Sequence, residues 1–375
     1  MRNNVKYYRL FVVCLLQAVL VSCANKTNKN SPALISLDTR ITSWVDAGYY
    51  DGASVAVIKD GLSFFEANYG NYTDTTVLHV ASAGKWIAAA TIAAIVDEGK
   101  LSWDDKVSKF IPEFTDLKGE ATLCQLLSHT AGYPAYQPQN RKRDDYQTLE
   151  ESVRNIIVLP IDTLPGTKFQ YGGLAMQVAG RMAEITTGKD WESLFQEKIA
   201  IPLHMTHSHF TPVSDEGGFN PMLGGGFRTC RRDYMNFLEM FFNKGSYKGK
   251  RVLSEESIRR IEADQVKNAV VNQPEYVFNA RQNSHNGIYG LGLWREEIDN
   301  DGKAIIISSP GWAGTYPWID RKHNVYGFII AKANVKVCND AGFSSFYGSA
   351  VLPLFVRDAI KQLNNPQYDT KRYAE

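Results

Sequence analysis

The clearest candidates for chemistry are Ser82 and Lys85, three residues apart at the start of the apolar segment VASAGKWIAAATIAAIVDEGK. A serine hydroxyl is a weak nucleophile until a neighbouring base takes its proton. Residues three apart on a helix share a face, so Lys85 can lie beside Ser82. Lysine can accept that proton only if its surroundings hold it neutral, which apolar neighbours favour. The spacing predicts a nucleophile and its base, although a helix-capping serine before a solvated lysine fits the same residues.

The start of a helix also offers a place for negative charge. Its first main-chain N–H groups lack intrahelical partners, and the helix dipole is positive there. The N–H of Ser82 would be one of these groups, so it can stabilise the oxyanion formed when a hydroxyl attacks an acyl carbon. The segment therefore points to acyl chemistry.

Five further motifs follow this segment along the chain. They are LLSHTAGYP (126–134), LPGTKFQYGG (164–173), LGGGFRTCRRD (223–233), YGLGLW (289–294) and SSPGWAGTYPWID (308–320). With them, the chain from about 36 to 362 resembles the serine β-lactamase-related hydrolases, which include class C β-lactamases, D-Ala-D-Ala peptidases and many esterases. The resemblance implies an α+β, β-lactamase/transpeptidase-like fold, with an antiparallel sheet flanked by helices and a helical subdomain.

The resemblance also implies roles for individual residues. Ser82 would be the acyl-accepting nucleophile and Lys85 its activating partner. Tyr171 would be the second proton-transfer residue, its phenol lying between the nucleophile and the leaving group. The main-chain N–H groups of Ser82 and Trp312 would form the oxyanion hole. No cofactor is implied, and the partner is a small-molecule acyl substrate.

Two substrate-binding positions depart from the family pattern. Gly173 stands where the family has the asparagine of Tyr-x-Asn, which would bind an acylamino group. Ser309, before Pro310 and Gly311, stands where the family often has lysine or histidine. Losing that cation removes a charge-assisted contact worth about 1.5–3 kcal/mol to a substrate carboxylate. We therefore expect Gly173, Ser309, Gly311 and Trp312 to bind an ester rather than a β-lactam or D-Ala-D-Ala peptide.

Three functions remain open from the sequence. The preferred one is an esterase acting through an acyl-enzyme on Ser82, with acyl transfer to another hydroxyl as a variant. The second is a β-lactamase or D-Ala-D-Ala carboxypeptidase. The third is a non-catalytic binding or sensor lipoprotein of the same fold, which is disfavoured because Ser82, Lys85 and Tyr171 are all present.

The N-terminus predicts export and lipid attachment. Residues 1–23 combine early basic residues with an apolar run from Leu10 to Val21 and end in LVSC, as in a lipoprotein signal peptide with its lipobox Cys23. Residues 24–35 would be a flexible tether, 36–362 the hydrolase domain and 363–375 a polar tail. We expect a protein anchored to a membrane of the bacterial cell envelope, facing the periplasm, while an ordinary signal peptide is the alternative.

Composition and cysteine spacing narrow the possible partners. The 375 residues include 41 basic and 40 acidic ones, a balance that argues against binding nucleic acid. Beyond Cys14 and Cys23, the chain has Cys124, Cys230 and Cys338, with no CxxC pair. A cysteine zinc site is therefore not expected, and at most one disulfide can form among these three.

Histidines offer a second possible chemistry. His204, His207 and His209 lie close enough in sequence to bind zinc, but no acidic cluster follows within a few residues to complete a site. No metal is therefore expected. His129 could form a Ser–His pair, yet no Gly-x-Ser-x-Gly elbow surrounds any serine, so it is interpreted as structural.

The elements that must position these residues come from distant parts of the chain. We expect a helix over 35–48, a hairpin turning at Lys59-Asp60-Gly61, and a helix over 82–98. A mainly helical stretch from about 104 to 300 precedes three strand-like runs, and YGLGLW is interpreted as a strand. Strands from both ends would form one sheet with a helical insertion.

Four aromatic residues accompany the motifs and could line an acyl site. They are Trp86, Trp312, Tyr316 and Trp318. Core packing is the preferred interpretation for Trp86 and Trp318, whereas Trp312 is closer to the predicted oxyanion hole.

Overall fold

The computed structural model describes residues 32–137, 145–213, 217–271, 287–312 and 314–365. Cys23, the predicted signal peptide and the end of the polar tail lie outside these residues. No helix in the described ranges is both long enough and apolar enough to span a membrane.

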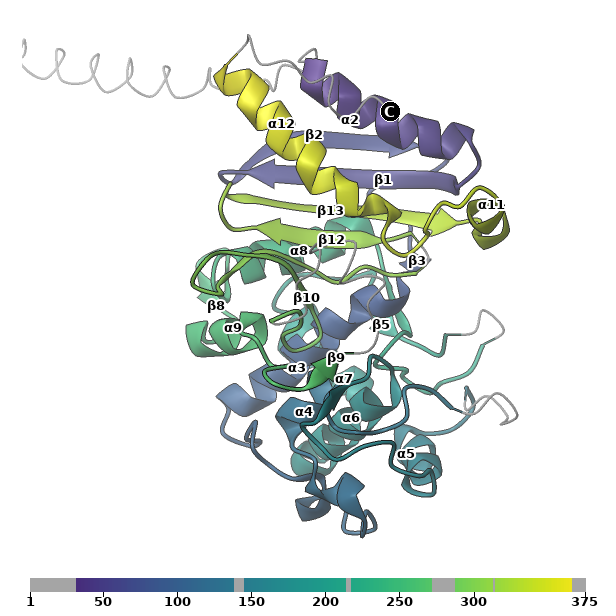
Figure 1. Cartoon of the computed structure of the whole chain (residues 1–375), viewed down its shortest axis with the longest axis vertical. Coiled ribbons are helices and arrows are strands. Elements are labelled where there is room, and N and C mark those ends of the chain that lie inside the picture. Colours follow the sequence, from purple (N-terminus) through teal and green to yellow (C-terminus); the bar gives the residue numbers. More distant parts are fainter. Residues whose placement is uncertain (1–31, 138–144, 214–216, 272–286, 313, 366–375) are drawn as a thin grey trace, which may run out of the picture.

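A six-stranded antiparallel sheet joins the two ends of the chain (Figure 1). Its spatial order is β10 (Trp294–Ile298), β11 (Ala304–Ser308), β12 (Tyr316–Asp320), β13 (Val325–Ala333), β1 (Tyr50–Lys59) and β2 (Leu62–Tyr69). The expected hairpin is confirmed, since Asp60 and Gly61 connect β1 to β2 with φ angles of 50° and 77°. β1 then pairs with β13, so the N-terminal hairpin extends a sheet made from C-terminal strands.

Helices cover both faces of this sheet, which confirms the predicted α+β class. α2 (Pro32–Asp46) and α12 (Leu352–Asn364) pack against each other over one face, as Figure 1 shows. α8 (Arg231–Phe242) packs against β13, β12 and β1 on the other face. Apolar side chains of the strands alternate between these two layers, as expected of strands buried on both sides.

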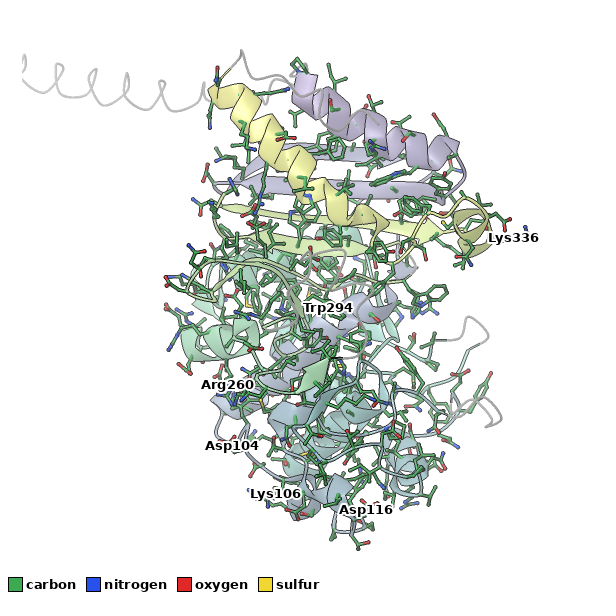
Figure 2. The ribbon with its side chains drawn as sticks, in the orientation of Figure 1. Asp104, Lys106, Asp116, Arg260, Trp294 and Lys336 are labelled. Carbon is green, nitrogen blue, oxygen red and sulfur yellow. The ribbon has the colours of Figure 1, made fainter. Side chains whose placement is uncertain are left out.

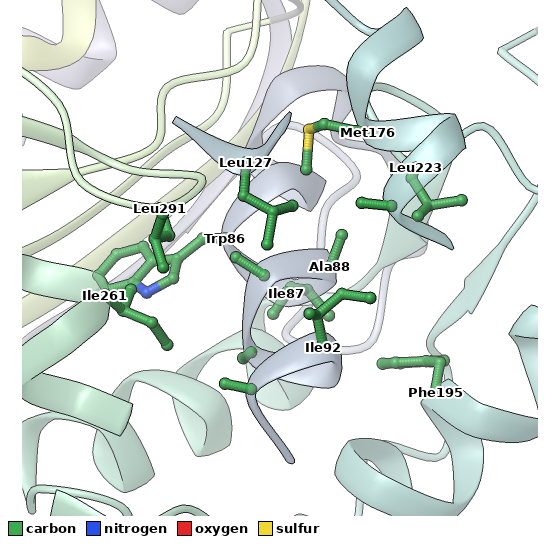
Figure 3. Close-up of a cluster of buried hydrophobic side chains, with 14 of the residues drawn as sticks. Trp86, Ile87, Ala88, Ile92, Leu127, Met176, Phe195, Leu223, Ile261 and Leu291 are labelled. Carbon is green, nitrogen blue, oxygen red and sulfur yellow. The ribbon is translucent and has the colours of Figure 1, made fainter. Parts of the chain in front are cut away.

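α3 (Gly84–Asp97) forms the centre of the helical region. All its residues from Gly84 to Ile95 are buried, because small and branched apolar side chains surround the helix axis on every side. Figure 3 shows Trp86, Ile87 and Ile92 of α3 among apolar side chains from other segments. α6 (Leu174–Thr187), α7 (Trp191–Phe195) and α9 (Glu255–Glu262) pack against α3, and α4 (Leu123–Leu127) and α5 (Leu149–Ile157) pack against α6.

Short strands and turns connect the sheet to the helical region. β3 (Leu78–His79), β6 (Phe227–Thr229) and β5 (His209–Phe210) form a small sheet, and β4 (Lys168–Phe169) pairs with β9 (Val270–Val271). Other short elements include the π-helical turn η4 (Gln196–Ala200), β7 (Ser246–Tyr247), β8 (Lys250–Arg251) and α11 (Val335–Asp340).

One predicted element is wrong. YGLGLW is a tight turn in which Tyr289 bridges Trp294, and the strand β10 begins only at Trp294. The chain turns at Gly292, whose φ is +70°. A Cβ there would lie 2.4 Å from the Lys85 carbonyl oxygen, so glycine permits the close approach to α3.

The structure shows where the predicted core tryptophans and the three cysteines lie. Trp86 and Trp318 are fully buried in the core, as preferred from the sequence. Cys124, Cys230 and Cys338 are buried free thiols, so no disulfide joins these three residues in the structure.

Candidate active site

Ser82 lies on a strained turn just ahead of α3. Residues Ala81–Ala83 form a 3-10 turn, and Ala81 has a φ of +49°, which is unusual for a residue with a side chain. Gly84 starts the helix against Phe227, where a Cβ would lie 2.4 Å from the Phe227 Cβ. Ser82 is 8% exposed. The turn thus holds the hydroxyl at the edge of the core, as a nucleophile requires.

Lys85 lies beside that hydroxyl. Its Nζ lies 3.1 Å from the Ser82 Oγ and also donates to the Gly224 carbonyl oxygen. The side chain is 1% exposed, and burial lowers its pKa to about 7. Burial disfavours the charged ammonium, so a large fraction of Lys85 is neutral near neutral pH and can accept a proton. The predicted pair is therefore in contact and suitably poised.

Tyr171 approaches Ser82 from the loop before α6. Its hydroxyl is hydrogen-bonded with Ser82, and burial raises the pKa of its phenol. The Lys85 Nζ lies 4.7 Å from the centre of the Tyr171 ring. Because its pKa is raised, the phenol stays protonated at neutral pH and can donate rather than accept a proton. The structure brings together all three predicted catalytic side chains.

An aromatic cluster supports the back of Tyr171. The ring of Tyr171 lies 4.8 Å from that of His129 and 5.2 Å from that of Trp294, measured between centroids. Tyr289 completes the cluster, with its hydroxyl 3.2 Å from the His129 Nε2. Figure 2 shows Trp294 where the sheet meets the helical region. These contacts leave the tyrosine ring little freedom to leave Ser82.

His129 contributes to this cluster as a neutral side chain. Burial, followed by the nearby Lys85 charge, holds the pKa of its imidazole well below the usual value. Its φ of +58° and its hydrogen bond with Tyr289 fix it behind Tyr171. This placement agrees with the structural role predicted for it.

The segment predicted to complete the oxyanion hole, 309–312, is hydrogen-bonded to the turn that carries Ser82. Ser309 Oγ donates to the Ser82 carbonyl oxygen at 3.0 Å and also contacts the Gly292 carbonyl oxygen at 3.2 Å. Gly311 N–H donates to the Thr315 carbonyl oxygen at 2.8 Å. A Cβ at Gly311 would lie 2.2 Å from the Val80 carbonyl oxygen, so only glycine fits there.

Trp312 follows Gly311 at the edge of this contact. Its side chain is 47% exposed, unlike the buried Ser309. The hydrogen bond of Ser309 Oγ to the Ser82 carbonyl oxygen holds this segment against the turn that carries Ser82. The main-chain N–H groups of Ser82 and Trp312 thus lie on two segments in direct contact, which is compatible with the predicted oxyanion hole.

Of the predicted substrate-binding residues, Ser309 is buried, whereas Gly173 borders open space. Ser309 is only 2% exposed and its hydroxyl is engaged with main-chain carbonyls, so it braces the nucleophile turn. Gly173 precedes α6, and a Cβ built there meets no atom within 4 Å. The space in which an asparagine side chain would begin is thus open.

Several residues of the site were not found from the sequence. Tyr234 of α8 donates from its hydroxyl to the Ala83 carbonyl oxygen at 2.7 Å. Thr315 Oγ1 donates to the Val80 carbonyl oxygen at 3.1 Å. Gly224 supplies the acceptor for Lys85. In all three contacts the acceptor is a main-chain carbonyl oxygen, which leaves no pattern in a sequence, although the LGGGF motif did mark the position of Gly224.

We expect Ser309→Ala to lower kcat by about tenfold and the free energy of unfolding by about 1–3 kcal/mol. The change removes a hydroxyl that contacts two buried main-chain carbonyl oxygens, one of which belongs to Ser82. A shift of the nucleophile by a fraction of an ångström reduces the rate more than it weakens binding, so KM should change little. Steady-state kinetics and thermal unfolding would measure both effects, and an unchanged kcat would contradict the bracing role.

The three histidines do not form one site. His204 lies near the Tyr247 ring, whereas His209 lies on β5 near Glu192. The main-chain N–H of His207 instead donates to the buried Asp233 at 2.6 Å. In the described part of the chain, the group with metal-binding side chains is His207, Cys230 and Asp233.

Known proteins are similar to this chain in both sequence and fold. A family model described as Beta-lactamase matches residues 37–341. A crystal structure of a "putative beta-lactamase" from Bacteroides dorei DSM 17855 is 51% identical, with a TM-score of 0.84 over 88% of this chain and 99% of that chain. EstCE1, described as "a hydrolase with promiscuous acyltransferase activity", has a TM-score of 0.67 at 19% identity, over 88% of this chain and 98% of that chain, and so shows the shared fold.

A curated relative covers less of the chain. A protein of Escherichia coli strain K12 named "Putative D-alanyl-D-alanine carboxypeptidase" is 29% identical over 258 residues. The match covers 59% of this chain and 58% of that protein, so the chain spans less than two thirds of the relative's length.

Proposed function

Because the chain belongs to the β-lactamase family of serine hydrolases, we propose that it hydrolyses carboxylic esters through an acyl-enzyme on Ser82. The observation that carries the proposal is the contact of Ser82 with a buried lysine whose pKa is near 7. Tyr171 beside the same hydroxyl supplies the second group that can transfer a proton.

The protonation states suggest an order of steps. Neutral Lys85 accepts the proton of the Ser82 Oγ as that oxygen bonds to the acyl carbon. The N–H groups of Ser82 and Trp312 stabilise the oxyanion. When the intermediate collapses, the bond to the alcohol oxygen breaks and Tyr171 donates its proton to that oxygen. The phenol then recovers a proton from Lys85, so no net proton is gained or lost.

Deacylation would repeat these steps with water. A water molecule takes the place of the departed alcohol, and its proton passes through Tyr171 and Lys85 back to Ser82 Oγ. An alcohol bound in the same place would give acyl transfer instead of hydrolysis. EstCE1, which shares the fold, is described as having such an acyltransferase activity, and this makes transfer a variant worth testing here.

Two positions favour an ester over an anionic amide. Where the family often has a cation, Ser309 is buried and hydrogen-bonded to the main chain. Gly173 has no side chain to hold an acylamino group. β-Lactam or D-Ala-D-Ala cleavage is the second candidate, since the 51% identical structure is described as a "putative beta-lactamase".

An envelope location with lipid on Cys23 also stays a proposal, which fatty-acid labelling of the wild type and Cys23→Ser would test.

A substrate panel tests the proposal. We expect kcat/KM for p-nitrophenyl acetate and butyrate to be at least about tenfold higher than for nitrocefin or a D-Ala-D-Ala peptide. The missing cation would have strengthened binding of the substrate carboxylate by about ten- to a hundredfold. Initial rates with the purified mature chain measure this ratio. Faster nitrocefin or peptide turnover would replace the ester proposal with the second candidate, and no acylation by any of them would contradict both.

A further inference from the structure

A second group of reactive side chains lies at the start of α8. His207 comes from the turn before β5, Cys230 is the N-cap of α8, and Asp233 lies in its first turn. One ligand atom from each lies within 4.8 Å of the others. The histidine and the cysteine are 23 positions apart in the sequence, so only the fold brings the three together.

One carboxylate oxygen of Asp233 accepts no hydrogen bond of normal geometry. Its Oδ2 accepts from the His207 N–H at 2.6 Å and from the Ser208 Oγ at 2.8 Å. Its Oδ1 is fully buried and accepts no hydrogen bond of normal geometry, although the Cys230 thiol interacts with the same carboxylate. Leaving a buried carboxylate oxygen unsatisfied is costly, so a ligand that meets it would be stabilising.

We propose that His207, Cys230 and Asp233 bind one divalent metal ion of the zinc type, with water as the fourth ligand. Thiolate, imidazole and carboxylate are the three ligand types that Zn²⁺ takes in proteins. The His207 Nδ1 lies 3.8 Å from the Asp233 Oδ1. Tetrahedral geometry with bonds of about 2.0–2.1 Å needs about 3.3 Å between such atoms, so a small side-chain rotation suffices.

The residues around this group leave a path for an ion from solvent and can balance its charge. The His207 side chain is 38% exposed, which leaves a path from solvent, while Cys230 and Asp233 are fully buried. On binding, the Cys230 thiol releases its proton to solvent and bonds to the metal through the thiolate, and the two anionic ligands then balance the ion's charge.

Four features oppose binding of the ion. The helix N-terminus carries a partial positive charge, and Arg232 lies nearby, although it is already paired with Asp74 through contacts of 2.9 and 2.7 Å. Thr206 Oγ1 lies 3.0 Å from the His207 Nδ1, and this contact must be exchanged for the metal. Burial raises the pKa of the Cys230 thiol to about 11, but a metal ion deprotonates a thiol that coordinates it.

A bound ion would link the turn before β5 to the helix that supports the nucleophile. α8 also carries Tyr234, which donates to the Ala83 carbonyl oxygen next to Ser82. Binding to the native state alone raises the unfolding temperature. The inference does not depend on the ester proposal, because its readouts are spectroscopic and thermal.

Cobalt(II) titration of the reduced, metal-free mature chain tests the inference. We expect a sulfur-to-cobalt charge-transfer band that saturates at one equivalent, with a Tm rise of a few degrees. His207→Gln should weaken binding at least tenfold, since it removes a half-exposed ligand with little effect on folding. Cys230→Ser should abolish the band.

Two matched variants serve as controls. His209→Gln changes an exposed histidine on the adjoining strand, and Cys124→Ser changes another buried thiol, so both should keep the wild-type titration. If Cys230→Ser does not fold, His207→Gln against His209→Gln decides the question. Absence of the charge-transfer band at millimolar cobalt, or equal binding by these two histidine variants, would overturn the proposal.

Discussion

Replacing Ser82 with alanine is expected to lower kcat for p-nitrophenyl esters by roughly 10⁴-fold or more while leaving the fold intact. Removing a nucleophile from a serine hydrolase removes the covalent route, and only binding and oxyanion stabilisation remain. The Ser82 Oγ contacts Lys85 and Tyr171, so no other hydroxyl shares its position between the two. Steady-state kinetics measure the loss.

Mass spectrometry separates a catalytic role from a structural one. The wild type should gain the mass of one phosphonyl group from a fluorophosphonate probe, and Ser82→Ala should gain none. Ser54→Ala is the matched control, because Ser54 is also fully buried but lies on β1 and donates to Asn68. Labelling of Ser82→Ala, or a comparable rate loss in Ser54→Ala, would place the nucleophile elsewhere.

The contact between the candidate catalytic side chains Ser82 and Lys85 was predictable because it follows from local spacing. Ser82 and Lys85 are three residues apart on one helical turn, so neighbouring positions along the sequence become neighbouring atoms. Tyr171 needed the family resemblance, since tyrosine is common in protein cores and nothing in its own sequence surroundings marks it as reactive. The structure adds the burial that brings the Lys85 pKa to about 7.

The fold was predictable where the periodicity was strong. The hairpin of β1 and β2 and the buried α3 follow directly from alternating and continuous apolar patterns. The strand predicted for YGLGLW was wrong, because its apolar residues suggest a strand, whereas Gly292 turns the chain against the Lys85 carbonyl oxygen. Only the close approach of two distant segments fixes that turn.

Residues that act through the main chain could not be predicted for a related reason. Ser309 looked like a substrate-facing position, and its buried hydroxyl instead holds the Ser82 carbonyl. The His207, Cys230 and Asp233 group has no local signature, because its cysteine and carboxylate lie more than twenty residues after the histidine. Tertiary contacts across such separations leave no spacing rule in the sequence.

Replacing Lys85 with methionine should lower kcat by about 10²–10⁴-fold and at the same time stabilise the protein at neutral pH. The first effect is the usual loss on removing a general base. For the wild type, kcat/KM should rise with pH through an apparent pKa near 7, because the neutral form of Lys85 is the base. Lys85→Met should lose that limb, and a wild-type profile flat between about pH 6 and 8 would contradict the assignment.

The stabilisation follows from proton linkage. The pKa of Lys85 falls from 10.5 to about 7 on folding, so between these values the unfolded chain binds the proton and the native protein does not. Wild-type stability therefore rises with pH across that window, and near pH 7 burial of Lys85 costs about 4 kcal/mol. Methionine removes this cost but leaves the Gly224 carbonyl without its donor, which costs about 1–3 kcal/mol. The net gain of about 1–3 kcal/mol should raise Tm at pH 7 and shrink toward pH 10, and a variant less stable than the wild type at pH 7 would mean that Lys85 stays charged in the folded protein.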